Sequence, residues 1–160
     1  MNTCVLPGGG PVRTGRSILL LALLGLACPA WAALGGNAAS VQLDSVHMQG
    51  TLTSTPGAGY KVAEIKTTNG QTVREFISAG GSVFGVAWEG PTTPDLERLL
   101  GTYFEEFRQS SERAQQQHRG PLLIETPNLV VQQSGHLRAF RGRAYLPLAL
   151  PSGVQPSEIQ

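Results

Sequence analysis

The stretch YKVAEIKTTNGQTVREFISAGGSVFGVAW, residues 60–88, decides the fold that this sequence predicts. It contains three runs typical of β-strands, at residues 60–67, 71–78 and 82–88. Asn69-Gly70 lies between the first two runs and predicts a type I′ hairpin turn, and Gly80-Gly81 predicts a similar reversal before the third. The stretch is therefore expected to form an antiparallel meander.

The third run has two different faces. By the alternation of a strand, Phe84, Val86 and Trp88 share one face, whereas Gly85 and Ala87 lie on the other. The small residues predict a face against which a helix can lie closely. Both faces of the sheet are then covered.

A long amphipathic helix is predicted after this meander. Thr93 is expected to cap its start, Pro94 suits the first helical position, and Gly120-Pro121 ends it. The apolar residues form one broad stripe: Leu96, Leu99, Leu100, Tyr103, Phe104, Phe107 and Ala114. The stripe thins after Phe107, so the end of the helix has little surface to bury.

Three more strands are predicted at residues 122–125, 129–133 and 137–146, and the last two are joined by a turn through Ser134-Gly135. Pro147, Pro151 and Pro156 predict an extended, non-helical tail over residues 147–160 that lies over the domain or hangs free. The tail is therefore not counted with the sheet.

The segment before the meander is rich in small residues. Residues 40–48 favour a short helix, with a strand as the alternative, and residues 53–59, which include Pro56, favour a loop. No strand–helix–strand alternation is visible. The predicted fold class is α+β, with a meander of about five or six antiparallel strands packed against one long amphipathic helix and a short N-terminal helix.

The N-terminus has the three regions of a signal peptide. Arg13 and Arg16 precede an apolar run over residues 18–27, and Ala30-Trp31-Ala32 matches the small-x-small pattern that a signal peptidase reads. A permanent membrane helix needs about 20 apolar residues, and the run over residues 18–27 is shorter than that. We therefore expect residues 1–32 to be a cleaved signal, residues 33–59 an N-terminal segment, residues 60–146 the α+β domain and residues 147–160 the tail.

Cys28 offers an alternative route, because Gly25-Leu26-Ala27-Cys28 loosely matches the box that directs lipid attachment. A lipidated Cys28 holds a domain at a membrane surface. Cleavage after Ala32 instead removes both cysteines, Cys4 and Cys28, and leaves no disulfide or thiolate metal site. We expect a periplasmic or secreted domain without a transmembrane anchor.

Charge and motif spacing exclude several classes of function. The chain has 12 basic and 11 acidic residues, and removing Arg13 and Arg16 turns its formal charge of +1 into −1. A near-neutral chain has no field to gather nucleic acid, so no nucleic-acid partner is expected. His47, His118 and His136 lack metal-ligand spacing, so neither a metal nor another cofactor is expected.

The candidate ligand-binding residues lie close together near the C-terminus: His136, Arg138, Arg141, Arg143 and Tyr145. On a strand, Arg141, Arg143 and Tyr145 share a face and present guanidinium donors beside an aromatic ring. That suits a carboxylate of an anionic glycan or of a partner protein of the cell envelope. The alternative is an ordinary solvent face whose arginines pair with acidic residues of neighbouring strands.

The chain resembles the DUF2844 family, a set of exported bacterial proteins of uncharacterised function. The likeness rests on three motifs: ALGG at residues 33–36, FGVAWEGP at residues 84–91 and GHLRAFRGRAYLP at residues 135–147. The resemblance implies export. It brings no catalytic or binding residues.

Three functions remain open. The leading hypothesis is a non-catalytic envelope or secreted binding module, because the chain has an export signal and lacks an active-site motif. The second is a hydrolase with an unrecognised site that uses Glu75, Glu89 or His136, which requires these groups to converge in one pocket. The third is a structural or assembly protein that docks through the tail or the end of the helix. The sequence leaves the oligomeric state open.

Overall fold

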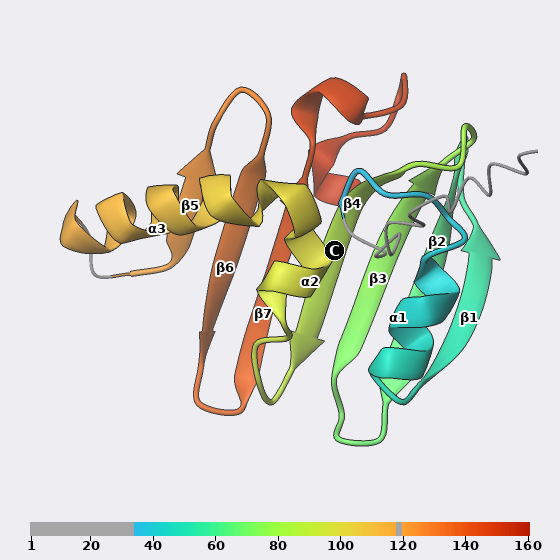
Figure 1. The fold of residues 1–160 in the computed structure, drawn as a ribbon, viewed down its shortest axis with the longest axis horizontal. Coiled ribbons are helices and arrows are strands. Elements are labelled where there is room, and N and C mark those ends of the chain that lie inside the picture. Colours follow the sequence, from blue (N-terminus) through green and yellow to red (C-terminus); the bar gives the residue numbers. More distant parts are fainter. Residues whose placement is uncertain (1–33, 118–119) are drawn as a thin grey trace, which may run out of the picture.

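A computed structural model describes residues 34–117 and 120–160. These residues form an α+β domain with one seven-stranded antiparallel sheet, in the order β1-β2-β3-β4-β7-β6-β5 (Figure 1). The strands are β1 (Gly50–Pro56), β2 (Tyr60–Thr67), β3 (Thr72–Ser78), β4 (Val83–Gly90), β5 (Leu122–Glu125), β6 (Val130–His136) and β7 (Ala139–Tyr145). The predicted fold class is confirmed, with slightly more strands than expected.

Two meanders meet in the centre of the sheet. β1 to β4 follow one another in sequence, as do β5 to β7, and β4 pairs with β7 along the seam between them. The helical segment between β4 and β5 carries the chain from one meander to the other (Figure 1). The two halves of the sheet are thus joined by strands that are distant in the sequence.

The hairpins of the first meander use a different turn from the predicted type I′. The Thr67 N–H donates to the Gln71 carbonyl and the Gly70 N–H to the Thr67 carbonyl, and Ser78, Gly81 and Ser82 repeat this pattern. Of each predicted pair, only the second residue has a positive φ, +87° at Gly70 and +83° at Gly81. These are three-residue loops that end in a left-handed glycine.

The helices lie on one face of the sheet, which we call the helix face (Figure 1). They are α1 (Val41–His47), α2 (Leu96–Leu100) and α3 (Phe104–Gln117), with a 3-10 turn at Gly101–Tyr103 between the last two. Both the short N-terminal helix and the long helical run are therefore confirmed. The predicted cap Thr93 is wrong, because the Asp95 side chain accepts the hydrogen bond from the Arg98 N–H.

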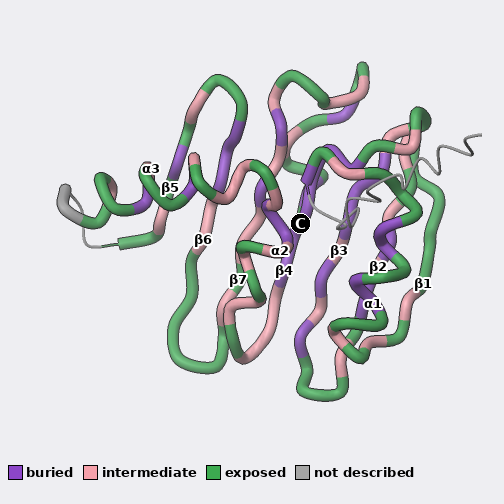
Figure 2. The backbone as a smooth tube through the Cα atoms, in the orientation of Figure 1, coloured by how far each residue is buried: buried purple, intermediate pink, exposed green. Residues whose placement is uncertain are grey.

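The main core lies between the sheet and these helices. Val73, Val86 and Trp88 pack there against Leu99 and Leu100 of α2. Figure 2 shows the buried residues concentrated on the central strands, whereas β1 is mostly intermediate or exposed. The position of Trp88 agrees with the predicted alternation.

The opposite face, which we call the outer face, has a smaller core covered by the C-terminal tail. Val154 and Ile159 of the tail pack with Phe76, Phe84 and Ala87. The predicted position of Phe84 is wrong, because an irregularity between Phe76 and Ile77 shifts the register and moves Phe84 to this side. The small residues of β4 accept the tail rather than a helix.

The tail is folded onto the domain. It contains two 3-10 turns, Pro147–Ala149 and Pro156–Glu158, so the prediction of a wholly non-helical tail is wrong. Ile159 is fully buried and lies against Gly85, where an added Cβ would come within 2.9 Å of the isoleucine side chain. The tail is therefore part of the structure and not a free docking arm.

Two further predictions are wrong. The expected loop at residues 53–59 is largely β1, which pairs with β2 over its whole length. The expected turn at Ser134-Gly135 lies inside β6, and the chain reverses at Leu137-Arg138 instead, where Arg138 has a φ of +65°. β6 is consequently longer than expected.

The predicted signal peptide lies outside the described residues. In the part of the chain that is described, no helix has the length and hydrophobicity needed to cross a membrane.

Candidate functional site

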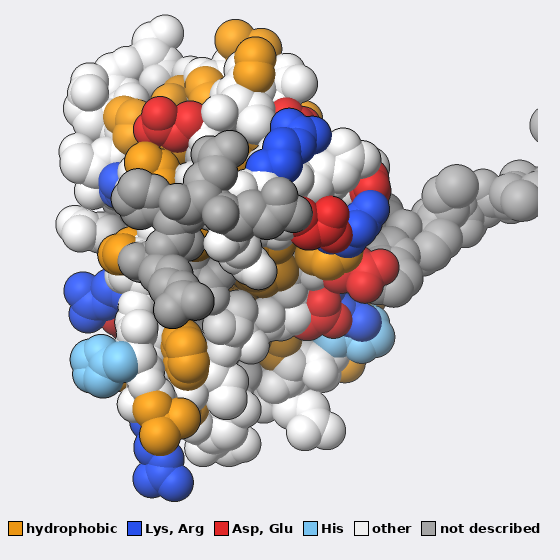
Figure 3. Space-filling view, turned by 90° about the vertical axis from the view of Figure 1, so that its left-hand side faces the viewer, with side chains coloured by type: hydrophobic (Ala, Val, Ile, Leu, Met, Phe, Trp, Pro, Cys, Tyr) orange, Lys and Arg blue, Asp and Glu red, His pale blue; other side chains and the backbone are white. Residues whose placement is uncertain are grey.

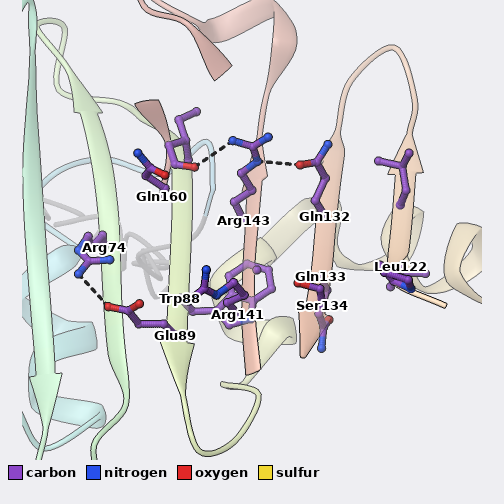
Figure 4. Close-up of a pocket in the computed structure, with 14 residues that line it drawn as sticks. Arg74, Trp88, Glu89, Leu122, Gln132, Gln133, Ser134, Arg141, Arg143 and Gln160 are labelled. Carbon is purple, nitrogen blue, oxygen red and sulfur yellow. Dashed lines mark hydrogen bonds and ion pairs between the residues drawn. The ribbon is translucent and has the colours of Figure 1, made fainter. Parts of the chain in front are cut away.

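A groove of about 780 Å³ lies on the outer face of the sheet (Figure 4). The cross-strand register places Glu89, Arg141 and Ser134 in one row, and Arg143 and Gln132 in the next. Side chains in a row point to the same face of a sheet. Leucines of β5 line one side of the groove, and residues of the tail line another.

Arg74 belongs to an ion-pair network beside this groove. Its Nε lies 2.8 Å from Oε2 of Glu64, and its Nη2 lies 2.9 Å from Oε1 of Glu89. Hydrogen bonds from Lys66 and Arg74 hold the pKa of Glu64 below its ordinary value. The charge of Arg74 is therefore balanced within the protein.

Arg143 is held in place by the tail. Its Nε donates to Oε1 of Gln132 over 2.8 Å (Figure 4). Its Nη1 donates to the carbonyls of Pro156 and Ile159 over 2.8 and 3.4 Å. These contacts join β7, β6 and the tail. Arg143 thus shapes the groove and has few donors left for a ligand.

Arg141 is the available cation of the groove. Arg141 is exposed and lies directly opposite Glu89 in the strand register, but Glu89 forms its ion pair with Arg74. Within residues 34–117 and 120–160, the Arg141 guanidinium has no hydrogen-bond or ion-pair partner. The pairing with acidic residues that an ordinary solvent face requires is thus absent at Arg141.

The other three predicted residues lie elsewhere. Tyr145 packs against the outer-face core. His136 and Arg138 are exposed at the tip of the β6–β7 hairpin, which carries basic, imidazole and apolar side chains at the lower end of the view in Figure 3. Of the five predicted residues, the structure brings Arg141 and Arg143 together in the groove.

A second cavity of about 650 Å³ lies on the helix face, between α3 and the C-terminal meander. Its apolar lining includes Phe107 and Ala114 of α3 and Phe140 of β7. It shares Gln133 and Ser134 of β6 with the groove of the outer face. The two cavities therefore flank the same part of the sheet.

Two carboxyl groups are buried together on the helix face. Asp44 of α1 is 2% exposed and Glu75 of β3 is 0% exposed. Both Glu75 carboxyl oxygens and Oδ2 of Asp44 lack a hydrogen-bond donor among the described residues. A hydrogen bond between the two groups requires that one of them carries a proton.

Burial makes this pair hold its protons strongly. Desolvation raises the pKa of Glu75 to about 8, and the nearby Asp44 adds to the shift. Desolvation also raises the pKa of Asp44 to about 6, although the positive charge of Arg98 opposes this. Below about pH 6 the pair is neutral, which is the form that a buried site favours.

The candidate catalytic groups do not converge. Glu75 is buried on the helix face, Glu89 lines the groove on the outer face, and His136 lies at the hairpin tip. A hydrolase site built from these three residues is thus not supported. Across the described part of the chain, no three His, Asp or Glu residues gather as metal ligands.

Fold and groove together define a small α+β domain with an open sheet face that carries an arginine-lined cavity. Residues 30–159 match the family described as protein of unknown function, DUF2844, and the chain belongs to this family. No curated protein and no solved structure shows significant similarity to the chain.

Proposed function

We propose that the chain is an exported, non-catalytic binding module whose outer-face groove takes a ligand bearing a carboxylate. The observation that carries this proposal is the guanidinium of Arg141, which has no partner among the described residues and lies in a cavity large enough for a ligand. Arginine offers two parallel donors that match a carboxylate, and such charge-assisted bonds are stronger than neutral ones. The partner is an acidic protein of the envelope or an anionic glycan.

The surroundings of Arg141 support the same proposal. Arg143 is fixed by its contacts with Gln132 and the tail, so the groove exists before a ligand arrives. Gln132 and Ser134 add polar groups beside the cation. A site that is already formed loses less conformational freedom on binding than a flexible one.

Export is supported by the sequence of the N-terminus, and the position of Leu34 is compatible with cleavage after Ala32. Leu34 lies two residues beyond the predicted cleavage after Ala32, is buried, and its N–H donates to the Leu99 carbonyl over 2.9 Å. Cleavage at Ala32 leaves this anchoring residue in the mature protein. Mass spectrometry of the purified mature chain is expected to find Ala33 at its N-terminus, and a lipid-modified Cys28 would overturn free export.

Binding is tested by calorimetry with two carboxylate probes, a galacturonic acid heptamer and a blocked heptapeptide that alternates valine and glutamate. At least one probe is expected to bind, and Arg141→Gln should weaken that binding at least fivefold. Arg138→Gln is the matched control, because it removes the same charge from an exposed site outside the groove. Absence of binding by both probes contradicts the proposal, as does equal loss in the two variants.

A further inference from the structure

The edge of β6 is only partly covered by β5. Their pairing runs from Glu125↔Val130 to Leu122↔Gln133 and stops there, whereas β6 continues through Ser134–His136. In the described chain, Gly120 and Pro121 make no backbone hydrogen bond to these three residues. Figure 1 shows this half of β6 extending past β5 with β7 on its other side. Its outward main-chain groups can therefore pair with another strand.

The two cavities flank this free edge on opposite faces. The groove with Arg141 includes Ser134 on the outer face, and the cavity between Phe107 and Phe140 includes Ser134 and Gly135 on the helix face. A strand added here would continue the line of β5. Its alternate side chains would enter the two cavities in turn.

We infer that the free edge of β6 at Ser134–His136 binds an extended segment of a partner protein by strand addition, with an acidic side chain on Arg141 and an apolar neighbour in the cavity of Phe107 and Phe140. This inference rests on the proposed function and names its partner class. In strand addition the main chain supplies affinity and the alternate side chains supply specificity.

The register assigns a side chain to each face. Ser134 pairs with Arg141, so a residue opposite Ser134 faces the outer groove. Gly135 pairs with Phe140, so the neighbouring residue of the added strand faces the apolar cavity. The segment that fits therefore alternates acidic and apolar residues.

The distances favour glutamate at the acidic position. Adjacent strands are about 4.8 Å apart, which places an added strand roughly 10 Å from β7. An arginine and a glutamate can meet across the short Ser134 side chain that lies between them. Gly135 places no side chain between the added strand and Phe140, and both residues line the helix-face cavity.

A polypeptide explains more of these features than a glycan does. A carboxylate of either kind can bind Arg141, but an unpaired strand edge presents N–H and C=O groups at the spacing of another strand. The apolar cavity beside the same edge also suits a leucine or valine side chain better than sugar hydroxyls. An acidic glycan is thus the competing occupant that the experiment must separate.

The test uses the valine–glutamate heptapeptide and calorimetry on the purified protein. Two versions carry N-methyl groups, one on all valine nitrogens and one on all glutamate nitrogens. Because alternate residues of a strand point their N–H groups to opposite sides, we expect one version to lose at least tenfold in affinity and the other to lose less. A version with lysine in place of glutamate should also lose at least tenfold.

Variants of the protein locate the site. Ser134→Glu places a carboxylate directly opposite Arg141 and should abolish peptide binding, since the exposed Ser134 tolerates a larger side chain. Arg141→Gln should lower the affinity for the valine–glutamate heptapeptide at least fivefold, and Arg138→Gln should leave this affinity unchanged. Circular dichroism of each variant confirms that it is folded.

The outcomes separate this inference from the proposed function. If the galacturonic acid heptamer binds through Arg141 and the peptide does not, the proposed function holds and strand addition is overturned. If both N-methylated peptides bind as well as the parent peptide, strand addition is likewise overturned. If neither carboxylate probe binds, both proposals fall.

Discussion

Arg74 and Glu75 are neighbours on β3 but lie on opposite faces of the sheet, where their ionisable groups have very different surroundings. On the outer face, Arg74 is partly exposed and has two carboxylate partners within 2.9 Å. On the helix face, Glu75 is fully buried beside a second acid, Asp44, and no hydrogen-bond donor among the described residues reaches its carboxyl oxygens. One residue along a strand thus separates a paired charge from a buried carboxyl group that has no hydrogen-bond donor among the described residues.

This difference shows what each face contributes. The helix face supplies most of the apolar core and therefore accepts a carboxyl group only in its protonated form. The outer face has a smaller core and a hydrogen bond from Arg143 to the tail. Its groove contains Arg141, whose guanidinium has no partner among the described residues. Stability resides mainly on the first face, and recognition is proposed for the second.

Trp88→Ala should cause the largest loss of unfolding free energy among the changes on the helix face. Trp88 is buried at the centre of the main core, and removing a large buried aromatic side chain costs about 4 kcal/mol. Urea unfolding measures the loss. Leu148→Ala, at a residue that is 85% exposed, is the control and should change little. A loss below about 1 kcal/mol for Trp88→Ala would contradict this view of the core.

Glu75→Gln should make the helix face less sensitive to pH. The folded-state pKa values of Glu75 and Asp44 lie above their ordinary values, so the folded protein binds these protons more tightly than the unfolded chain. Their stabilising effect is complete below about pH 4 and is lost as the pH rises through about 6 and about 8. Asp95 and Arg98 are the other charged groups that influence Asp44.

The glutamine variant removes the ionisation of Glu75 and keeps the shape of its side chain. At about pH 7 its unfolding free energy should exceed that of the parent by about 3 kcal/mol, because this pH lies about 2.5 units above the ordinary pKa of 4.5 while Glu75 in the folded parent is still protonated, and one pKa unit corresponds to about 1.4 kcal/mol. The difference should vanish near pH 4. Denaturant unfolding across this range provides the measurement, with the exposed Glu125→Gln as control. Parallel pH profiles for Glu75→Gln and the parent would refute a protonated Glu75.

Ile159→Ala should weaken the outer face by a smaller amount. Ile159 is fully buried against Gly85, and truncating a buried isoleucine costs about 2 kcal/mol. Hydrogen exchange should show that the tail opens more often while β3 and β4 stay protected. Ser157→Ala is exposed and serves as the matched change in the tail. Equal destabilisation of the main core would show that the two faces are not separate.

Arg143→Gln and Arg141→Gln compare two arginines on the same strand and face. Loss of the two short bonds from Arg143 to Gln132 and to Pro156 of the tail should cost about 2 kcal/mol, because each hydrogen bond contributes about 1 kcal/mol. Arg141→Gln should leave the unfolding free energy within about 0.5 kcal/mol of the parent. Thermal melts of both variants check this, and equal losses would assign Arg141 a structural role.

Much of the fold follows from local patterns. The bounds of β2 and β5 agree with the alternation of their residues, and the turn glycines at Gly70 and Gly81 mark the first two hairpins. The turn at Leu137-Arg138 escaped prediction because it contains no glycine, asparagine or proline. Gly135 was misread as a turn residue, although its glycine is needed because an added Cβ would lie 2.4 Å from the Ala139 carbonyl oxygen.

The candidate site was less predictable. Strand alternation indicates that Arg141 and Arg143 share a face, but only the folded tail reveals that Arg143 is hydrogen-bonded to it. Arg141 has no such partner in the described part of the chain. Arg74 and Glu89 come from the other meander, and no local pattern places them beside the groove. Glu75 did leave a signal, because it lies between Val73 and Ile77 on an apolar face.

The seam between β4 and β7 has a consequence for how the chain folds. It pairs residues 85–90 with residues 140–145, so the first meander keeps an open inner edge until the last strand has been made. Contacts between such distant segments close slowly, because a long loop must be ordered before they form. We therefore expect formation of this seam to be the rate-limiting step of folding. Until it forms, the unpaired edges of β4 and β7 can pair with strands of other chains.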